Sequence, residues 1–233
     1  MGALRRGDRG GLRGGAALSG RRPVLFVTNH APPFRVGAFA VLHEREDVVF
    51  ALIGGDLRHG GGLAGGGPGP DAGLPFPVLR PTQRGVARLA ASGRFRAVVA
   101  GLSGRLAPAA AYLGARRARV PFVLWATLWA HPRTPAHVLS SLPVRHLYRH
   151  ADAIATYGPH VSAYVRAKGA RAPVIEAPQS VDDAFWAAPA TPDRRAPFQA
   201  VFAGRMAREK GVCVLLEAWR DAGFTAAPPT ALI

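Results

Sequence analysis

Short apolar runs of strand length alternate with amphipathic stretches of helix length along most of this 233-residue chain. Runs such as 24–28 and 97–100 contain few polar positions, which is typical of strands that a parallel sheet buries on both faces. The alternation predicts an α/β fold in which a Rossmann-like, doubly wound parallel sheet carries helices on both faces. The expected strands are 24–28, 47–53, 74–79, 97–100, 121–129, 153–157 and 173–176, and the expected helices between them are 36–43, 83–92, 102–117, 134–150 and 158–168.

Three segments lack this alternation. Residues 1–21 are rich in Gly and Arg and offer no apolar face to bury, so we expect a disordered tail there. Residues 54–70 are rich in glycine but lack a fixed Gly-x-Gly-x-x-Gly spacing and a following amphipathic helix, which favours a flexible loop over a phosphate cradle. Residues 181–197 are rich in Pro and Asp and are typical of a linker between domains.

A further strand, turn and helix follow the linker. The apolar run 198–203 predicts a strand that Gly204 ends, and apolar residues then recur at helical spacing, namely Val212, Leu215, Leu216 and Trp219. Arg205 follows the strand and Lys210 lies near the start of the helix. Free backbone amides and the helix dipole favour an anion at that position, so the two cations would suit a diphosphate.

These residues resemble a known family. Gly204-Arg205 followed by Glu209-Lys210-Gly211 is similar to the signature that opens the carboxyl-terminal domain of GT-B glycosyltransferases of the family 4 type. The resemblance implies retaining, metal-independent sugar transfer, with Gly204, Arg205 and Lys210 at the diphosphate of a nucleotide-sugar donor. An ordinary strand-helix turn with two solvated cations is the alternative.

Two upstream segments extend the resemblance. Ala151-Asp-Ala-Ile-Ala155 is similar to a family strand, and Pro178-Gln-Ser-Val-Asp-Asp-Ala-Phe185 is similar to the family's entry to the linker, although Gln179 and Ser180 stand where the family has Asn and Gly. The resemblance implies an amino-terminal, acceptor-side domain over 22–180, the linker 181–197, and the start of a nucleotide-sugar-binding domain over 198–233.

The expected second domain is short for its type. A Rossmann-like domain needs about 150 residues, so we expect the chain to be incomplete within this domain. The family's pair of Glu residues that grips the donor sugar and ribose would lie beyond Ile233, and we therefore expect this polypeptide alone to show no transferase activity.

Ligands bind parallel α/β sheets outside the carboxyl ends of the strands, which indicates three further site residues. The resemblance implies that His131, after the run 121–129, touches the donor sugar; packing against Trp129 or a hydrogen bond to a loop carbonyl is the alternative. Arg35 and Gly37 lie in the expected loop after the first strand, where the family has a Gly-Gly pair near acceptor and phosphates. Arg35 either meets an anionic acceptor or faces water.

Other classes of chemistry find little support. The sequence has no Cys/His metal spacing and no Gly-x-Ser-x-Gly elbow, so we expect neither a metal nor a cofactor beyond the nucleotide-sugar substrate. The single cysteine, Cys213, lies among apolar neighbours of the last helix, which predicts a core thiol rather than a nucleophile.

The net charge of +16 bears on partners and location. The basic residues are dispersed arginines apart from Lys168 and Lys210, so we expect no nucleic acid partner but a surface suited to nucleotides or an anionic membrane face. No signal-peptide pattern opens the chain, and the longest apolar run, 120–130, is too short to span a bilayer. We expect a cytoplasmic protein, with peripheral association with the membrane as an open alternative, and an unknown acceptor that is either a lipid or a glycan. Two other functions stay open: a basic nucleic-acid-binding module, and another GT-B-fold enzyme such as a nucleotide-sugar epimerase.

Overall fold

The structure is a computed structural model that describes residues 20–54, 73–102, 104, 106–130, 135–181, 199–200, 202–204, 206, 208–222 and 231–232. The chain divides into two compact units, Met1–Trp186 and Ala187–Ile233, which are considered separately below. The division falls within the predicted linker, 181–197. Nearly all of the predicted tail and linker, and all but the first residue of the glycine-rich loop, lie outside the described residues.

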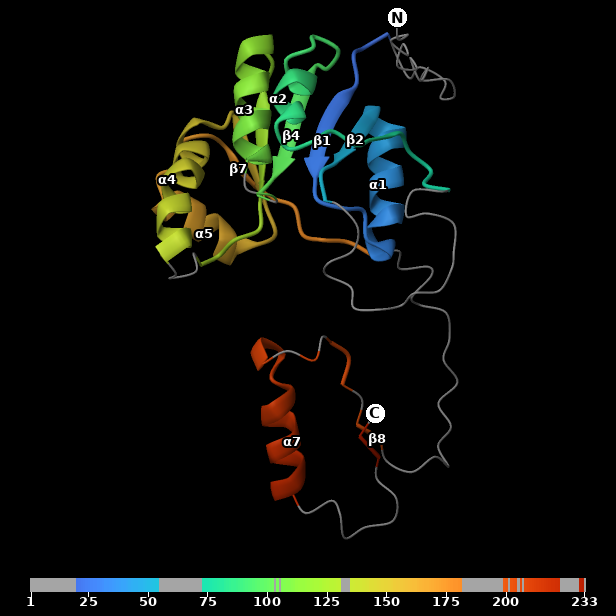
Figure 1. The fold of residues 1–233 in the computed structure, drawn as a ribbon, viewed down its shortest axis with the longest axis vertical. Helices are drawn as coiled ribbons and strands as arrows, with labels where there is room; N and C mark the ends of the chain where they lie inside the picture. The colour runs from blue at the N-terminus through green and yellow to red at the C-terminus, as the bar shows by residue number, and fades with distance from the viewer. Residues whose placement is uncertain are drawn as a thin grey trace, which may run out of the picture. The chain divides into compact units, whose positions relative to one another are not determined.

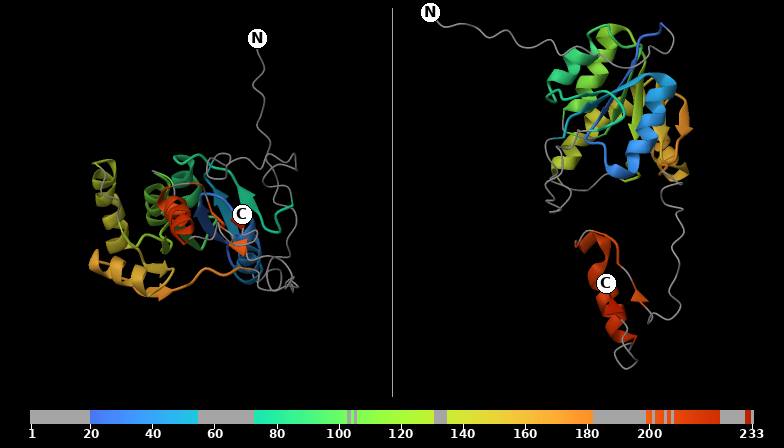
Figure 2. Two further views of the ribbon diagram at one scale, coloured as in Figure 1. Left: turned by 90° about the horizontal axis from the view of Figure 1, so that it is seen from below. Right: turned by 90° about the vertical axis from the view of Figure 1, so that its right-hand side faces the viewer.

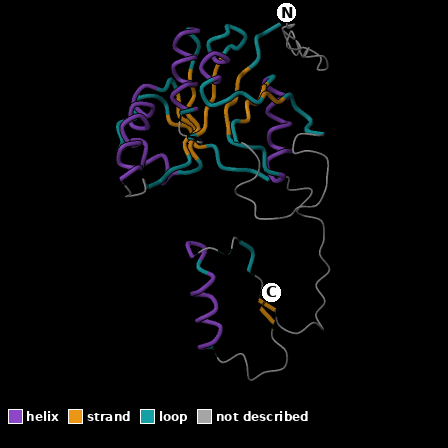
Figure 3. The backbone as a smooth tube through the Cα atoms, in the orientation of Figure 1, coloured by secondary structure: helices purple, strands orange, loops and turns teal. Residues whose placement is uncertain are grey.

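The first unit is built on a parallel seven-stranded sheet (Figures 1 and 3). Its strands are β1 (Val24–Thr28), β2 (Val48–Leu52), β3 (Val78–Leu79), β4 (Ala97–Gly101), β5 (Phe122–Ala126), β6 (Ala153–Thr156) and β7 (Val174–Glu176). Their order is β3-β2-β1-β4-β5-β6-β7, and every neighbouring pair is parallel. The direction of winding reverses between β1 and β4, which confirms the predicted Rossmann-like, doubly wound sheet.

Five helices connect these strands. They are α1 (Pro33–Glu46), α2 (Gly85–Ala90), α3 (Ala107–Ala118), α4 (Pro135–His150) and α5 (Pro159–Ala167). Proline lies in the first turn of α1, α3 and α5, where its fixed φ suits the helix and its missing N–H would have no intrahelical partner. None of the helices in the part of the chain that the structure describes is long and apolar enough to cross a membrane.

The two faces of the sheet are covered unequally. One face packs on α2, α3, α4 and α5 in a large aliphatic core. Of the described helices, α1 alone packs on the other face (Figure 2). Its Phe39 belongs to an aromatic cluster with Phe26, Phe50 and Phe76 of the sheet side. All residues of β1 and β2 are buried, whereas those of β5 alternate between buried and half-buried. The α1 face of the sheet is therefore incompletely covered over β4, β5 and β6.

The start of α1 corrects the predicted loop after the first strand. Pro32 is extended, with φ −69° and ψ 152°, and the helix begins at Pro33. Because Pro33 already has the φ that a helix requires, the turn is limited to a few residues. Arg35 and Gly37 therefore lie on the first two turns of a helix, and the prediction that they belong to a loop was wrong.

The end of β5 also differs from the prediction. The strand stops at Ala126, although the apolar run continues to Trp129. Trp125 pairs with Gly101, the last residue of β4, and Ala126 pairs with Thr156, the last residue of β6, so the chain beyond has no neighbour to pair with. His131 does not directly follow the strand, and it lies outside the described residues.

The second unit contains a parallel pair, β8 (Gln199–Ala200) and β9 (Ala231–Leu232). The 3-10 helix η1 (Arg208–Lys210) and helix α7 (Val212–Asp221) lie between them in the chain. The described elements of this unit thus follow one another in the order β-α-β, and a second Rossmann-like domain starting at 198 stays a prediction. Cys213 is exposed and α7 has no buried residue, because the described strands of this unit are too short to cover the helix. The prediction of a core thiol was wrong.

Candidate functional site

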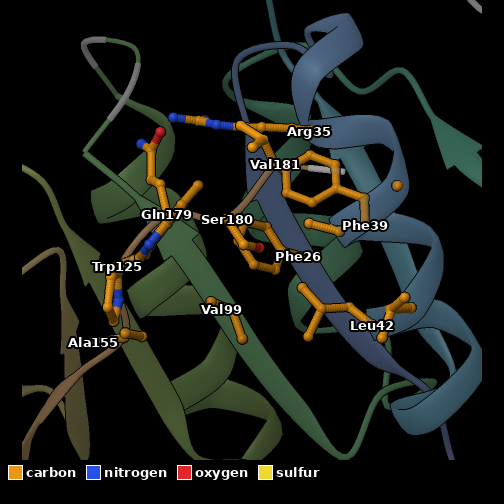
Figure 4. Close-up of a pocket in the computed structure, with 15 residues that line it drawn as sticks. Phe26, Arg35, Phe39, Leu42, Val99, Trp125, Ala155, Gln179, Ser180 and Val181 are labelled. Carbon is orange, nitrogen blue, oxygen red and sulfur yellow. The ribbon is translucent and has the colours of Figure 1, made fainter. Parts of the chain in front are cut away.

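A cavity of about 700 Å³ lies on the α1 face of the first unit (Figure 4). Its lining comes from α1, from β1, β4, β5 and β6, and from the segment 177–181 that follows β7. β1 and β4 flank the point where the winding of the sheet reverses, which is the usual place for a ligand in an open α/β sheet. The incomplete cover of this face thus produces a hollow where a ligand is expected.

The floor of the cavity follows from strand register. Phe26 of β1 pairs with Val99 of β4, and Trp125 of β5 pairs with Ala155 of β6. On its other side Trp125 pairs with Gly101, which has no side chain. Paired residues of parallel strands point to the same face, so the indole of Trp125 stands between two positions with little side-chain volume. The cavity exists because large and small residues alternate across the sheet here.

Helix α1 forms one wall. Phe39 is buried and stacks on Phe50 with ring centroids 4.5 Å apart, which fixes the helix on the sheet. Val41 and Leu42 are 44% and 38% exposed and also line the cavity. The wall and the floor together give the cavity a largely apolar lining.

Arg35 forms a polar end to this apolar cavity. Its Nη2 donates to the hydroxyl oxygen of Tyr157 over 3.0 Å, and its guanidinium lies 4.9 Å from the ring centroid of Trp125. The rings of Trp125 and Tyr157 meet edge to face at 5.4 Å. Arg35 is the only charged side chain among the described residues that line the cavity. Its Nε is buried and has no hydrogen-bond partner among the described residues.

Tyr157 lies directly after β6 and is half-buried. Burial raises the pKa of its phenol, while the charge of Arg35 and hydrogen bonds from Gln179 and Arg35 act in the opposite direction. The phenol is therefore neutral at pH 7, and its hydroxyl group lies beside the Arg35 guanidinium that forms the polar end of the cavity.

The segment 177–181 carries Gln179 to this position. The backbone N–H of Ala177 donates to the carbonyl oxygen of Thr156 over 2.7 Å, which holds the segment at the carboxyl end of β6. Gln179, Ser180 and Val181 then border the cavity (Figure 4). Arg35, Tyr157 and Gln179 thus meet from three distant parts of the sequence.

The predicted diphosphate residues belong to the second unit. Gly204 and Lys210 are exposed, and Arg205 lies outside the described residues. Lys210 ends η1, directly before Gly211, whose φ of 75° places it in the left-handed region at the N-cap of α7. The first turn of α7 has no acidic residue and no side-chain cap. Lys210 therefore lies at an uncompensated helix amino terminus, where an anion is favourable.

The described residues contain no group of three or more His, Cys, Asp or Glu side chains that could hold a metal ion.

Searches with the sequence match no family model and no curated protein. Solved structures do match. Anabaena Alr3699/HepE in complex with UDP and glucose is 14% identical, with a TM-score of 0.62, over 91% of this chain and 60% of that one.

The fold is that of one half of a GT-B protein. The structure of the same Anabaena protein with UDP-glucose agrees, with 15% identity and a TM-score of 0.62 over the same shares of the two chains. This chain spans about 60% of the length of the protein it matches. A UDP-N-acetylglucosamine 2-epimerase from Rickettsia bellii aligns over 68% of this chain with 12% identity and a TM-score of 0.44, which is too low to support an argument.

Sequence reasoning had singled out Arg35 and Gly37, and both line the cavity. The sequence predicts no role for Tyr157, which ends the predicted strand 153–157, or for Trp125, which lies within the predicted strand 121–129. The sequence signal for Tyr157 was its place directly before Gly158-Pro159, the start of α5. Nothing in the sequence marks Trp125 as a cavity residue rather than a core residue.

Proposed function

We propose that this chain takes part in the transfer of a sugar from a nucleotide-diphosphate sugar to an acceptor, as a GT-B glycosyltransferase that works with retention. The main support is the likeness to a protein crystallised with UDP-glucose. The alignment covers 91% of the 233 residues, more than the whole first unit, so it extends into the second. In this proposal 22–180 is the acceptor-side domain and 198–233 belongs to the donor side.

The donor-side chemistry is charge stabilisation. In the transfer the acceptor hydroxyl oxygen forms a bond to the anomeric carbon, the bond from that carbon to the diphosphate oxygen breaks with its electron pair going to that oxygen, and the hydroxyl proton passes to the departing diphosphate. Negative charge develops on the departing diphosphate. Lys210, with Arg205 and the amino terminus of α7, offsets this charge, and such preorganised groups supply much of the rate enhancement in enzymes. His131 contacts the donor sugar in this proposal.

Binding of UDP-glucose by isothermal titration calorimetry tests the donor side. Replacing Lys210 with Gln removes one charge-assisted contact, worth about 1.5–3 kcal/mol, so we expect at least about ten-fold weaker binding. Lys168→Gln is the matched control, because Lys168 is the other lysine and lies on α5, with its ammonium 5.3 Å from the ring centroid of Tyr164.

The control should bind UDP-glucose as the unmodified chain does. Equal binding by the Lys210→Gln variant, or equal losses in both variants, would remove Lys210 from the donor site. UDP should compete with UDP-glucose far better than glucose alone, because the charge-assisted contacts proposed for Lys210 and Arg205 are to the diphosphate.

A further inference from the structure

We propose that the cavity beside α1 binds an amphiphile with a phosphate head, its apolar body in the cavity and its phosphate on Arg35, Tyr157 and Gln179. The binding stands on the geometry of the first unit alone. Only the assignment of this ligand to the acceptor side of sugar transfer rests on the proposed function.

The apolar part of the cavity is long enough for an extended chain. Arg35 and Leu42 lie seven positions apart on α1, which corresponds to about 10 Å along the helix axis. They mark opposite ends of the cavity wall in Figure 4. Between them the lining includes Phe26, Phe39 and Val99, none of which offers a hydrogen bond from its side chain. The cavity volume of about 700 Å³ falls within the usual range for small-molecule sites, about 300–1,000 Å³.

Arg35 carries a charge that the described lining does not balance. No Asp or Glu is among the described residues that line the cavity, and the first turn of α1 has no acidic residue. A cation in the first turn opposes the helix dipole, at a cost of about 0.3–1 kcal/mol. An anion bound here would itself interact favourably with the helix dipole and would meet the guanidinium at the polar end of the cavity.

The donors at this end favour a phosphate head. Arg35 presents a planar guanidinium that suits two oxygens of one anion, the Tyr157 phenol is neutral, and Gln179 carries an amide. Three side chains converge on one place from α1, from the end of β6 and from the segment after β7. A phosphate monoester offers these donors three terminal oxygens and a charge of about −1.5 to −2, whereas a carboxylate offers two oxygens and a single charge. An uncharged head would leave the Arg35 charge unbalanced.

The test compares probes with one apolar chain and different heads, each below its critical micelle concentration. Decyl phosphate, decanoate and decyl maltoside are titrated into the full chain by calorimetry, with inorganic phosphate as the head-only probe. We expect decyl phosphate to bind at least about ten-fold tighter than each of the other three, because the other two heads lack at least one charge-assisted hydrogen bond and inorganic phosphate lacks the buried apolar chain. Equal binding of decyl maltoside, of decanoate or of inorganic phosphate would overturn the proposal.

Two variants locate the binding. Arg35→Gln should abolish the preference for decyl phosphate over decyl maltoside, whereas Arg94→Gln should keep it; Arg94 is a matched control whose guanidinium lies 5.8 Å from the ring centroid of Phe95. Ala155→Leu fills part of the cavity from the sheet and should weaken decyl phosphate and decyl maltoside alike. Circular dichroism and thermal melts establish that each variant is folded.

An unchanged preference in Arg35→Gln, or unchanged decyl binding in Ala155→Leu, would place the ligand elsewhere and refute the proposal. The result of the decyl phosphate titrations does not depend on whether the donor site binds UDP-glucose. Loss of UDP-glucose binding in Lys210→Gln with intact decyl phosphate binding supports both proposals separately. Absence of UDP-glucose binding by the unmodified chain would refute the donor contacts proposed for this chain and leave this inference standing.

Discussion

The guanidinium of Arg35 donates to the hydroxyl oxygen of Tyr157 over 3.0 Å, although the two residues are 122 positions apart in the sequence. Arg35 comes from the first turn of α1 and Tyr157 from the end of β6, so the contact joins the two sides of the point where the sheet reverses its winding. It spans the end of the cavity and holds α1 to the far half of the sheet.

A double-mutant cycle between Arg35→Gln and Tyr157→Phe should measure this contact. We expect a coupling free energy of about 0.5–1.5 kcal/mol in urea unfolding, since the contact is a half-buried hydrogen bond to a cation. The pair of Arg94→Gln with Tyr157→Phe serves as the additive control. A coupling indistinguishable from that control would show that the contact does not contribute to stability.

Tyr148→Phe should stabilise the first unit. The side chain is 2% exposed, and its hydroxyl has no hydrogen-bond partner among the described residues. A buried, unpaired polar group costs about 1–3 kcal/mol, so removing it should raise the free energy of unfolding by about 1 kcal/mol in urea denaturation. Tyr164→Phe, on the adjacent and more exposed ring, should change stability by less than about 0.5 kcal/mol. A loss of stability in Tyr148→Phe would indicate a partner that the described residues do not supply.

The same side chain predicts a pH dependence. Burial raises the pKa of Tyr148 in the folded state above its ordinary value of about 10, to which the unfolded chain returns. Below about pH 10 both states keep the proton; above it the unfolded state loses the proton first, so stability falls as pH rises. The decline between pH 9 and 11 should be shallower in Tyr148→Phe than in the unmodified chain. Identical slopes would contradict this assignment.

Asp152→Ala should destabilise the sheet. One carboxylate oxygen accepts the backbone N–H of the fully buried Phe122 over 2.7 Å, and the other accepts from Arg116 over 3.1 Å. We expect a loss of about 1–2 kcal/mol, because the variant leaves the Phe122 N–H unpaired. Glu46→Ala removes a comparable exposed ion pair, to Arg96 at 2.6 Å, and should cost less than about 1 kcal/mol. Equal losses in chemical denaturation would assign the effect to the ion pair instead.

Gly114→Ala should also destabilise the first unit, although alanine has a higher helix propensity than glycine. An added Cβ would lie 2.5 Å from the Cβ of Ala90 and 2.6 Å from the carbonyl oxygen of Ala87, where α3 crosses α2. Overpacking costs about 1–3 kcal/mol, against a propensity gain of at most about 1 kcal/mol. Leu113→Ala, at a site 62% exposed on the same helix, is the control for a change on α3 that leaves the crossing intact. A higher melting temperature for Gly114→Ala would show that the helices can separate.

The sheet was largely predictable because its strands are marked locally. The run 24–28 matches β1 in full, since a strand buried on both faces leaves a continuous apolar signature. β5 was predicted too long, because the sequence shows where apolar residues end but not where neighbouring strands stop pairing. The start of α1 was missed because Pro32-Pro33 was interpreted as part of a turn, whereas the second proline opens the helix.

The candidate site was predictable only in its local parts. Lys210 at the start of α7 follows from a strand-turn-helix pattern within a few residues. The role of Trp125 depends on how many helices cover each face of the sheet, which is a property of the whole unit. Gln179 reaches the cavity through the course of the chain after β7, which no local pattern encodes.

Protection of lysines from reductive methylation tests the central claim most directly, because Lys168 and Lys210 are the only lysines in the chain. Peptide mass spectrometry measures the modification rate of each one with and without UDP-glucose. We expect UDP-glucose to slow the modification of Lys210 and to leave the modification rate of Lys168 unchanged. Equal rates at Lys210 with and without UDP-glucose, at concentrations that saturate any binding seen by calorimetry, would contradict a donor diphosphate at the start of α7.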